Sequence, residues 1–169
     1  TYEATLTVKD GRGGKETATV TIEVDNTPPK PQIDSPGEGT TFHVGDKIKL
    51  LGSAVDVEDG NDMPKLSWEV ILHHKDHFHQ ILPPTEGKKV KLDAPAPFDL
   101  ESASSSYLVA KLTATDSSGL STMVERLIRP EIANVVVDTE PSGLTITANE
   151  ESFVTPAVIT SWAGQTLSL

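Results

Sequence analysis

The chain of 169 residues contains no cysteine. Disulfide bonds, thiolate metal sites and a cysteine nucleophile are therefore excluded. Basic residues are also scarce, because 14 Lys and Arg stand against 25 Asp and Glu, which gives a formal net charge of −11. Binding to a phosphate backbone depends on Lys and Arg, so we expect no nucleic-acid partner. Attraction to an anionic membrane surface is disfavoured for the same reason.

Long apolar runs are absent as well. No run approaches the roughly 18 residues that a membrane-spanning helix needs, so we expect no membrane insertion. The first residues have neither the basic nor the apolar stretch of an export signal. The sequence begins without Met and ends on the strand-like Leu167-Ser168-Leu169, and we interpret it as a segment of a longer polypeptide. With 36% hydrophobic residues, 12 Gly and 12 Pro, the composition is typical of a globular, β-rich protein.

Residues 1–26 have the pattern of a β-hairpin. Apolar and polar residues alternate over Tyr2–Val8 and again over Glu16–Val24, and a Gly-rich turn at 10–14 separates the two runs. Two strands cannot bury a core alone, so this hairpin either completes another sheet or packs on the next module of the chain. Residues 27–31 contain three prolines, which predict an extended linker.

The stretch from residue 32 to 130 predicts an antiparallel, immunoglobulin-like β-sandwich. Short strand-like runs recur there with Gly, Pro, Asn, Asp or Ser between nearly all of them. These runs are Phe42–Val44, Lys47–Val55, Leu66–Leu72, Lys88–Leu92, Tyr107–Thr115 and Thr122–Arg129. The run 107–120 also repeats the pattern of 2–14, which suggests that the first hairpin is the last hairpin of a second such sandwich.

Residues 131–169 predict a partial third β-module. Its strand-like runs are Asn134–Asp138, Leu144–Ala148 and Ala157–Thr160. The words Pro-Ser-Gly-Leu-Thr-Ile-Thr at 141–147 and Thr-Pro-Ala at 155–157 resemble the small β-modules called PEGA domains. That resemblance implies an accessory unit associated with cell walls or carbohydrate. The predicted fold class is therefore all-β throughout, with partial β-modules flanking one sandwich.

Two further resemblances concern the chain's setting. Residues 1–24 resemble the end of a polycystic-kidney-disease-type (PKD) repeat, an extracellular spacer. Segments 52–60, 66–70, 72–79, 112–120 and 141–144 together resemble the region downstream of the PKD repeat in secreted glucose/sorbosone-dehydrogenase-like proteins, which oxidise sugars with a quinone. The resemblance implies an extracellular or periplasmic setting, a carbohydrate context and neighbouring modules in the same polypeptide. Nothing here resembles the catalytic propeller, so dehydrogenase activity would lie outside these residues.

A calcium site is predicted in the loop after the run 47–55. Calcium takes six to eight oxygen ligands, and an acidic turn with Gly and Asn can supply them. In a sandwich, the turn after the run 107–115 lies at the same end and adds a carboxylate. The candidate ligands are Asp56, Glu58, Asp59, Asp62 and Asp116, with Asn61 beside them. The alternative is a solvated acidic turn.

A second candidate site lies at 73–79, which holds four of the five histidines. Neutral imidazoles are common zinc and copper ligands, and alternate positions would share one strand face. The candidate residues are His73, His74, Asp76, His77 and His79, with Asp76 able to orient a ligand ring. The alternative is an exposed loop whose histidines form hydrogen bonds or contact a polysaccharide or glycan. This cluster is expected at the end of the sandwich opposite Asp56.

Aromatic residues offer a third kind of site. Sugar rings stack on exposed aromatic faces, and Phe78 is the best stacking candidate. Trp68 lies mid-strand between apolar neighbours and is expected in the core, as in immunoglobulin-like domains. Trp162 could be either buried or exposed.

These observations favour a non-catalytic accessory module, carbohydrate-binding or spacer, of a secreted carbohydrate-active protein, stabilised by calcium. One alternative is a zinc- or copper-dependent redox or hydrolytic unit that uses the histidine cluster. The other is a structural spacer or adhesion module without a ligand. The sequence contains no nucleophile elbow, phosphate-binding loop or dinucleotide motif.

Overall fold

The computed structural model describes residues 2–22, 26–59 and 64–169, and these form strands, turns and loops without a helix. No helix long and apolar enough to cross a membrane occurs in this part of the chain. The all-β prediction is therefore confirmed. The strands are β1 (Tyr2–Lys9), β2 (Lys15–Ile22), β3 (Lys30–Ser35), β4 (Thr41–Phe42), β5 (Lys47–Val55), β6 (Lys65–His74), β7 (His77–Glu86), β8 (Lys89–Asp93), β9 (Tyr107–Thr115), β10 (Ser121–Pro130), β11 (Ile132–Val137), β12 (Thr145–Ala148), β13 (Glu151–Val154) and β14 (Ala157–Trp162).

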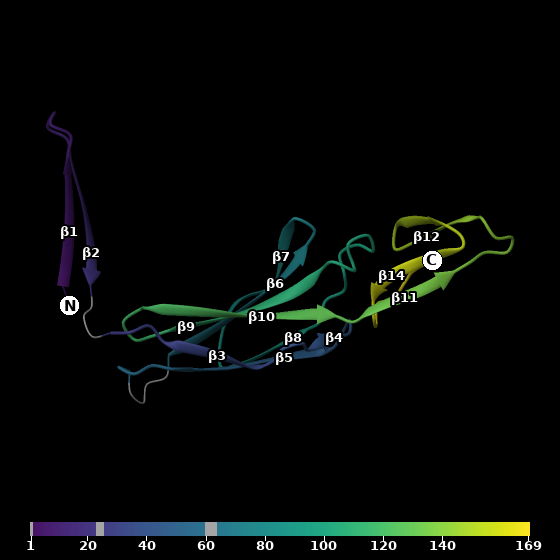
Figure 1. The fold of residues 1–169 in the computed structure, drawn as a ribbon, viewed down its shortest axis with the longest axis horizontal. Coiled ribbons are helices and arrows are strands. Elements are labelled where there is room, and N and C mark those ends of the chain that lie inside the picture. Colours follow the sequence, from purple (N-terminus) through teal and green to yellow (C-terminus); the bar gives the residue numbers. More distant parts are fainter. Residues whose placement is uncertain (1, 23–25, 60–63) are drawn as a thin grey trace.

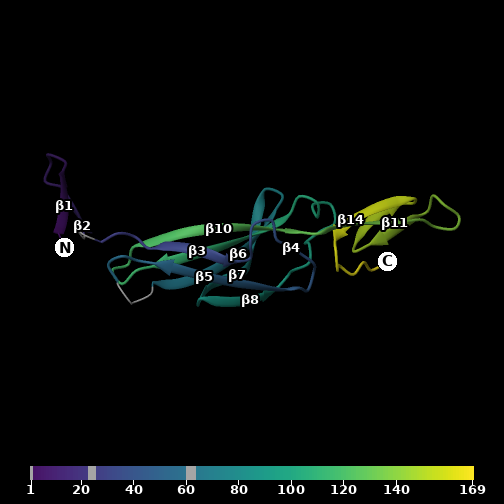
Figure 2. The ribbon, with the colours of Figure 1, turned by 60° about the horizontal axis from the view of Figure 1, so that its bottom comes forward.

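The central unit is a sandwich of two sheets (Figures 1 and 2). One sheet has the order β4-β10-β9-β6-β7, and the other has the order β3-β5-β8. Alternating burial in β5, β6 and β9 follows from their alternating sequences, because successive side chains point to opposite faces of a strand. This pairing order is that of an immunoglobulin-like sandwich, as predicted.

The core lies between the two sheets. Trp68 of β6 is fully buried there, which confirms its predicted place. Leu50 of β5, Leu112 of β9 and Ile128 of β10 are also fully buried in the same cluster. Burial of each such side chain contributes roughly 1.5–3 kcal/mol, so this core is the main source of the sandwich's stability.

One strand pair departs from the predicted antiparallel pattern. The chain leaves β3, which pairs antiparallel with β5, and enters the short β4, which pairs parallel with the end of β10. A strand was predicted at 42–44. The observed strand β4 is shorter and begins one residue earlier, at Thr41. The segment between the two strands contains the turn Pro36–Gly39, which carries the first strand of the sandwich from one sheet to the other.

The sequence-based prediction missed β3, β7 and β13 and misplaced several strand ends. β7 contains Pro83 and Pro84, which argue against a central strand, but it lies at the edge of its sheet, where missing N–H donors are tolerated. β3 begins at Lys30, inside the predicted linker of residues 27–31. β6 continues to His74, two residues beyond the predicted end.

The N-terminal hairpin forms as predicted, with Tyr2 paired to Ile22 and Lys9 to Lys15. All of its residues are exposed, including the apolar Leu6 and Val20. Figure 1 shows it, in purple, beyond one end of the sandwich.

The C-terminal residues form two small antiparallel pairs, β11-β14 and β12-β13. Their own core contains Ala148 and Ile159 together with Leu100, which comes from the loop between β8 and β9. Trp162, at the end of β14, is only 1% exposed and belongs to the sandwich core, where it packs edge-on against Phe42. The C-terminal unit is thus docked on the sandwich, at the end opposite the hairpin in Figure 1.

Candidate metal centre

Three of the predicted histidines converge at the tip of the β6-β7 hairpin. The pairing brings His74 opposite His77 and Leu72 opposite His79. Paired residues share a face of the sheet, so His74, His77 and His79 project together from the core-facing side. A two-residue turn, in which Lys75 has a φ of 54°, makes this close pairing possible.

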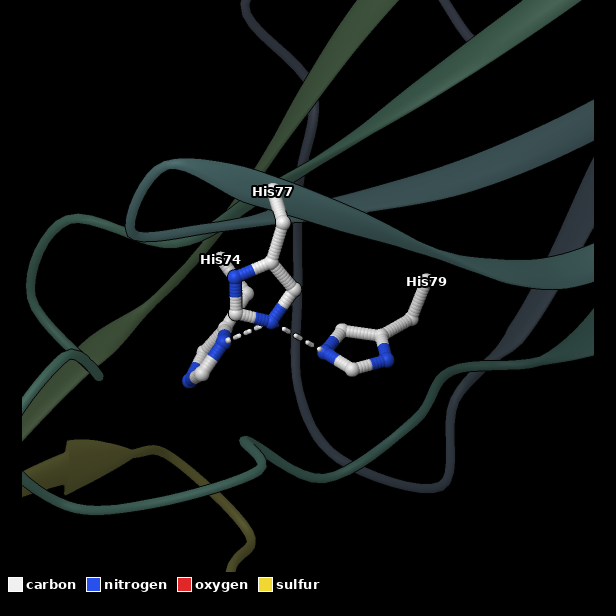
Figure 3. A group of neighbouring side chains, drawn as sticks. All are labelled: His74, His77 and His79. Carbon is white, nitrogen blue, oxygen red and sulfur yellow. Dashed lines mark hydrogen bonds between the residues drawn. The ribbon is translucent and has the colours of Figure 1, made fainter.

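The ring nitrogens of these residues form a compact set, called here the His74/His77/His79 centre (Figure 3). His77 Nε2 lies 3.1 Å from His74 Nδ1 and 3.0 Å from His79 Nε2. One nitrogen from each ring lies within 4.8 Å of the other two. Zinc–nitrogen bonds of 2.0–2.1 Å in a tetrahedron place ligand nitrogens about 3.3 Å apart, and the two separations from His77 Nε2 are close to this value.

Two carboxylates hold the far sides of these rings. His74 Nε2 donates to Asp99 Oδ2 at 2.8 Å, and His77 Nδ1 donates to Asp76 Oδ1 at 3.2 Å. A carboxylate accepts only, so each contact fixes a proton on the nitrogen that faces the acid. In the neutral rings, His74 Nδ1 and His77 Nε2 then carry lone pairs directed at each other across 3.1 Å. Such a contact is repulsive between two neutral rings, and it becomes attractive when one ring is protonated or when both nitrogens bind one metal ion.

Asp99 was not a predicted site residue, yet it is the better-fixed of the two carboxylates. Its Oδ1 accepts from the Ser102 hydroxyl at 2.6 Å and from the Ser102 backbone N–H at 2.8 Å. The Ser102 hydroxyl is the largest cause of a pKa of Asp99 well below the usual range, although partial burial opposes it. Asp99 therefore stays ionised and is oriented to hold His74. Asp99 lies 25 residues after His74 in the sequence, so no local motif connects the two residues.

The third ring is kept neutral by its surroundings. Desolvation is the main cause of the lowered pKa of His79, and the neighbouring His77 and His74 add to the effect. The His79 ring also stacks on Phe98, with centroids 3.8 Å apart and planes at 16°. A neutral, aligned imidazole is the form that binds a metal ion.

Two other residues predicted for this site, His73 and Phe78, lie on the opposite face. His73 pairs with Phe78, and its ring stacks on Tyr107 with centroids 4.9 Å apart. The Arg129 guanidinium lies 5.5 Å from the centre of the Tyr107 ring. The stacked His73 and Tyr107 rings therefore cover one another's faces. Phe78 is 63% exposed, and its exposure agrees with the prediction.

The acidic loop lies at the other end of β6, as expected. Asp56 Oδ1 accepts from the backbone N–H groups of Glu58 and Asp59, and Asp59 accepts from the backbone and hydroxyl of Ser117. Glu58 accepts from Thr27 at 2.8 Å. Groups of three or more His, Asp or Glu side chains can share a metal ion when their ligand atoms lie close together. Among residues 2–22, 26–59 and 64–169, the His74/His77/His79 centre is the only such group.

Asp116 joins this loop end to Asn26, the residue before the predicted linker. Its Oδ2 accepts from Asn26 Nδ2 at 2.8 Å, and its Oδ1 accepts from the backbone of Ser118 and Leu120. Burial alone would raise the pKa of Asp116, but these hydrogen bonds outweigh burial and lower it. Asp62 and Asn61, also predicted to bind calcium, lie outside the described residues.

No protein-family model matches the chain, and a search of curated proteins found no match.

Proposed function

We propose that this chain is an accessory β-sandwich module that binds one divalent transition-metal ion at the His74/His77/His79 centre. The observation that carries the proposal is the contact between His74 Nδ1 and His77 Nε2 at 3.1 Å, with a carboxylate behind each ring. Both lone pairs point inward, and a metal ion satisfies them together with His79.

The donor set favours zinc or copper over calcium at this centre. Imidazole nitrogens suit zinc and copper, whereas calcium prefers oxygen ligands. Ligand histidines in metal sites commonly donate their second N–H to a carboxylate, as His74 does to Asp99 and His77 does to Asp76. Three protein ligands leave a fourth position for water or an external donor.

The wider setting of the module stays a proposal based on resemblance. A secreted, carbohydrate-associated polypeptide with several modules would use such a sandwich as a binding unit or spacer. The exposed ring of Phe78 supports glycan contact. Calcium at the acidic loop also stays a prediction. In its support, Asp56 Oδ2 is buried and has no hydrogen-bond partner among the described residues.

Calorimetric titration of the metal-free chain with zinc, and separately with copper, tests the proposal. We expect one ion per chain. His77→Ala should weaken zinc binding by at least about 100-fold, the upper end of the effect of removing a group that only orients a ligand.

His73→Ala is the matched control. His73 neighbours the centre in sequence, but its side chain stacks on Tyr107 on the other face of the sheet. It should bind zinc as the unmodified chain does. The proposal fails if the unmodified chain binds no zinc or copper, or if His73→Ala weakens binding as much as His77→Ala does.

A further inference from the structure

The loop that carries Asp99 touches two parts of the molecule. Asp99 Oδ2 accepts from His74 at the metal centre. The next residue, Leu100, donates its backbone N–H to Glu151 Oε1 at 2.7 Å, and Glu151 begins β13 of the C-terminal unit. Two consecutive residues therefore bond to the sandwich hairpin and to the C-terminal unit.

Side-chain packing strengthens the second connection. Leu100 is buried in the small C-terminal core with Ala148 and Ile159. Its side chain is thus part of a unit formed mainly by residues 131–169. Displacement of Leu100 would expose apolar surface in that core, which makes the position of the loop energetically coupled to docking of the unit.

The same loop is connected to β14 through a tight turn. Asp99 Oδ1 holds the backbone and hydroxyl of Ser102, and Ala103 N–H bonds to Leu100 C=O at 3.3 Å. The Ala103 carbonyl accepts the indole N–H of Trp162 at 2.7 Å. Residues 99–103 therefore form one hydrogen-bonded unit that joins His74 to both β13 and β14.

We infer that metal occupancy of the His74/His77/His79 centre stiffens the joint between the sandwich and the C-terminal unit. The inference rests on the proposed function. An ion on His74 Nδ1 strengthens the ring's Nε2–H as a donor to Asp99, because metal binding polarises the imidazole. The fixed Asp99 then holds the 99–103 turn, and with it Leu100 and the Trp162 partner Ala103.

Coupling between sites is reciprocal, so docking of the C-terminal unit must also raise metal affinity. Asp76 offers an internal comparison. It holds His77 in the same centre, but it lies at the exposed tip of the hairpin. In the described part of the chain, His77 is its one side-chain partner. Asp99 and Asp76 therefore orient two ligands of one ion, and only Asp99 continues to the C-terminal unit.

Hydrogen exchange of the full 169-residue chain, with and without saturating zinc, tests the inference. Zinc should slow amide exchange in residues 99–106 and 148–162 by about fivefold or more, the low end of typical coupling between sites. Asp76→Asn, measured at saturation, should retain this protection. Asp99→Asn should bind zinc more weakly and, at saturation, show no protection in 148–162.

Glu151→Ala provides a second variant, which removes the acceptor of the Leu100 N–H and leaves the metal centre and Asp99 intact. It should keep zinc protection in 99–106 and near Trp162, which still bonds to Ala103, and lose it in β13. If zinc binds but exchange in 148–162 does not change, or if Asp99→Asn keeps that protection, or if Asp76→Asn loses it, the inference is wrong and the proposed metal site stands. If no zinc binds, the proposed function fails and this inference fails with it.

Discussion

Trp162 allows a direct measurement of how far the sandwich depends on residues outside it. The indole is 1% exposed, packs edge-on against Phe42 with ring centroids 5.3 Å apart, and donates to the Ala103 carbonyl at 2.7 Å. Truncation of a buried Trp to Ala costs about 3–5 kcal/mol. We therefore expect Trp162→Ala to lower the free energy of unfolding of the sandwich by that amount.

Trp162→Phe separates packing from hydrogen bonding. The phenyl ring keeps much of the contact with Phe42 but leaves the Ala103 carbonyl, on a fully buried residue, without its donor. An unsatisfied buried acceptor costs about 1–3 kcal/mol, so this variant should lie between the unmodified chain and Trp162→Ala.

Urea unfolding followed by fluorescence suits this test, because the chain has two tryptophans and the other, Trp68, is fully buried in the sandwich. In both variants Trp68 alone reports on the sandwich. Val158→Ala, at an exposed position of the same strand, is the control and should change stability by less than about 0.5 kcal/mol. A loss below about 1 kcal/mol for Trp162→Ala would refute the docking of β14 into the sandwich core.

Two further predictions concern the sandwich itself. Gly52→Ala should destabilise the chain by about 1–3 kcal/mol, because the added Cβ would lie 2.5 Å from Leu112 Cδ2 and 2.9 Å from Trp68 Cζ2. Gly37→Ala is the control in the same urea assay. It should be close to neutral, since the atom nearest to its added Cβ lies 3.8 Å away. Asp116→Asn should destabilise near neutral pH. Since folding lowers the pKa of Asp116, its ionised form stabilises the fold above the ordinary pKa of about 4, and this contribution is lost as pH falls through the lower folded value. Urea midpoints of both proteins should therefore converge in acid, and a gap that stays constant with pH would contradict this account.

The sandwich could be predicted because its core strands have a strong period of two. β5, β6 and β9 alternate clearly, and Trp68 lies on the buried side of that alternation. The edge strand β7 could not be predicted in this way, since its burial is irregular and its prolines resemble a loop. The parallel pairing of β4 depends on a chain crossing that local sequence does not encode.

The candidate site was predictable only in part. The cluster of histidines indicated metal binding, but the sequence could not show that His74, His77 and His79 share a face while His73 points away. That division depends on a two-residue turn and on the register that pairs His74 with His77. Asp99 lies 25 residues from His74, and only the packing of the loop before β9 brings it within 2.8 Å.

If the module serves as a spacer, the positions where the chain enters and leaves the sandwich set its reach. The linker is bonded at the end that carries Asp116, and the chain departs through β10 into β11 at the other end (Figure 1). The ten residues of β10, at about 3.3 Å per residue, set this span at roughly 33 Å. About a hundred residues therefore advance the polypeptide by the length of one strand. Copies joined in series would extend the reach of whatever they connect in steps of that size, along one direction.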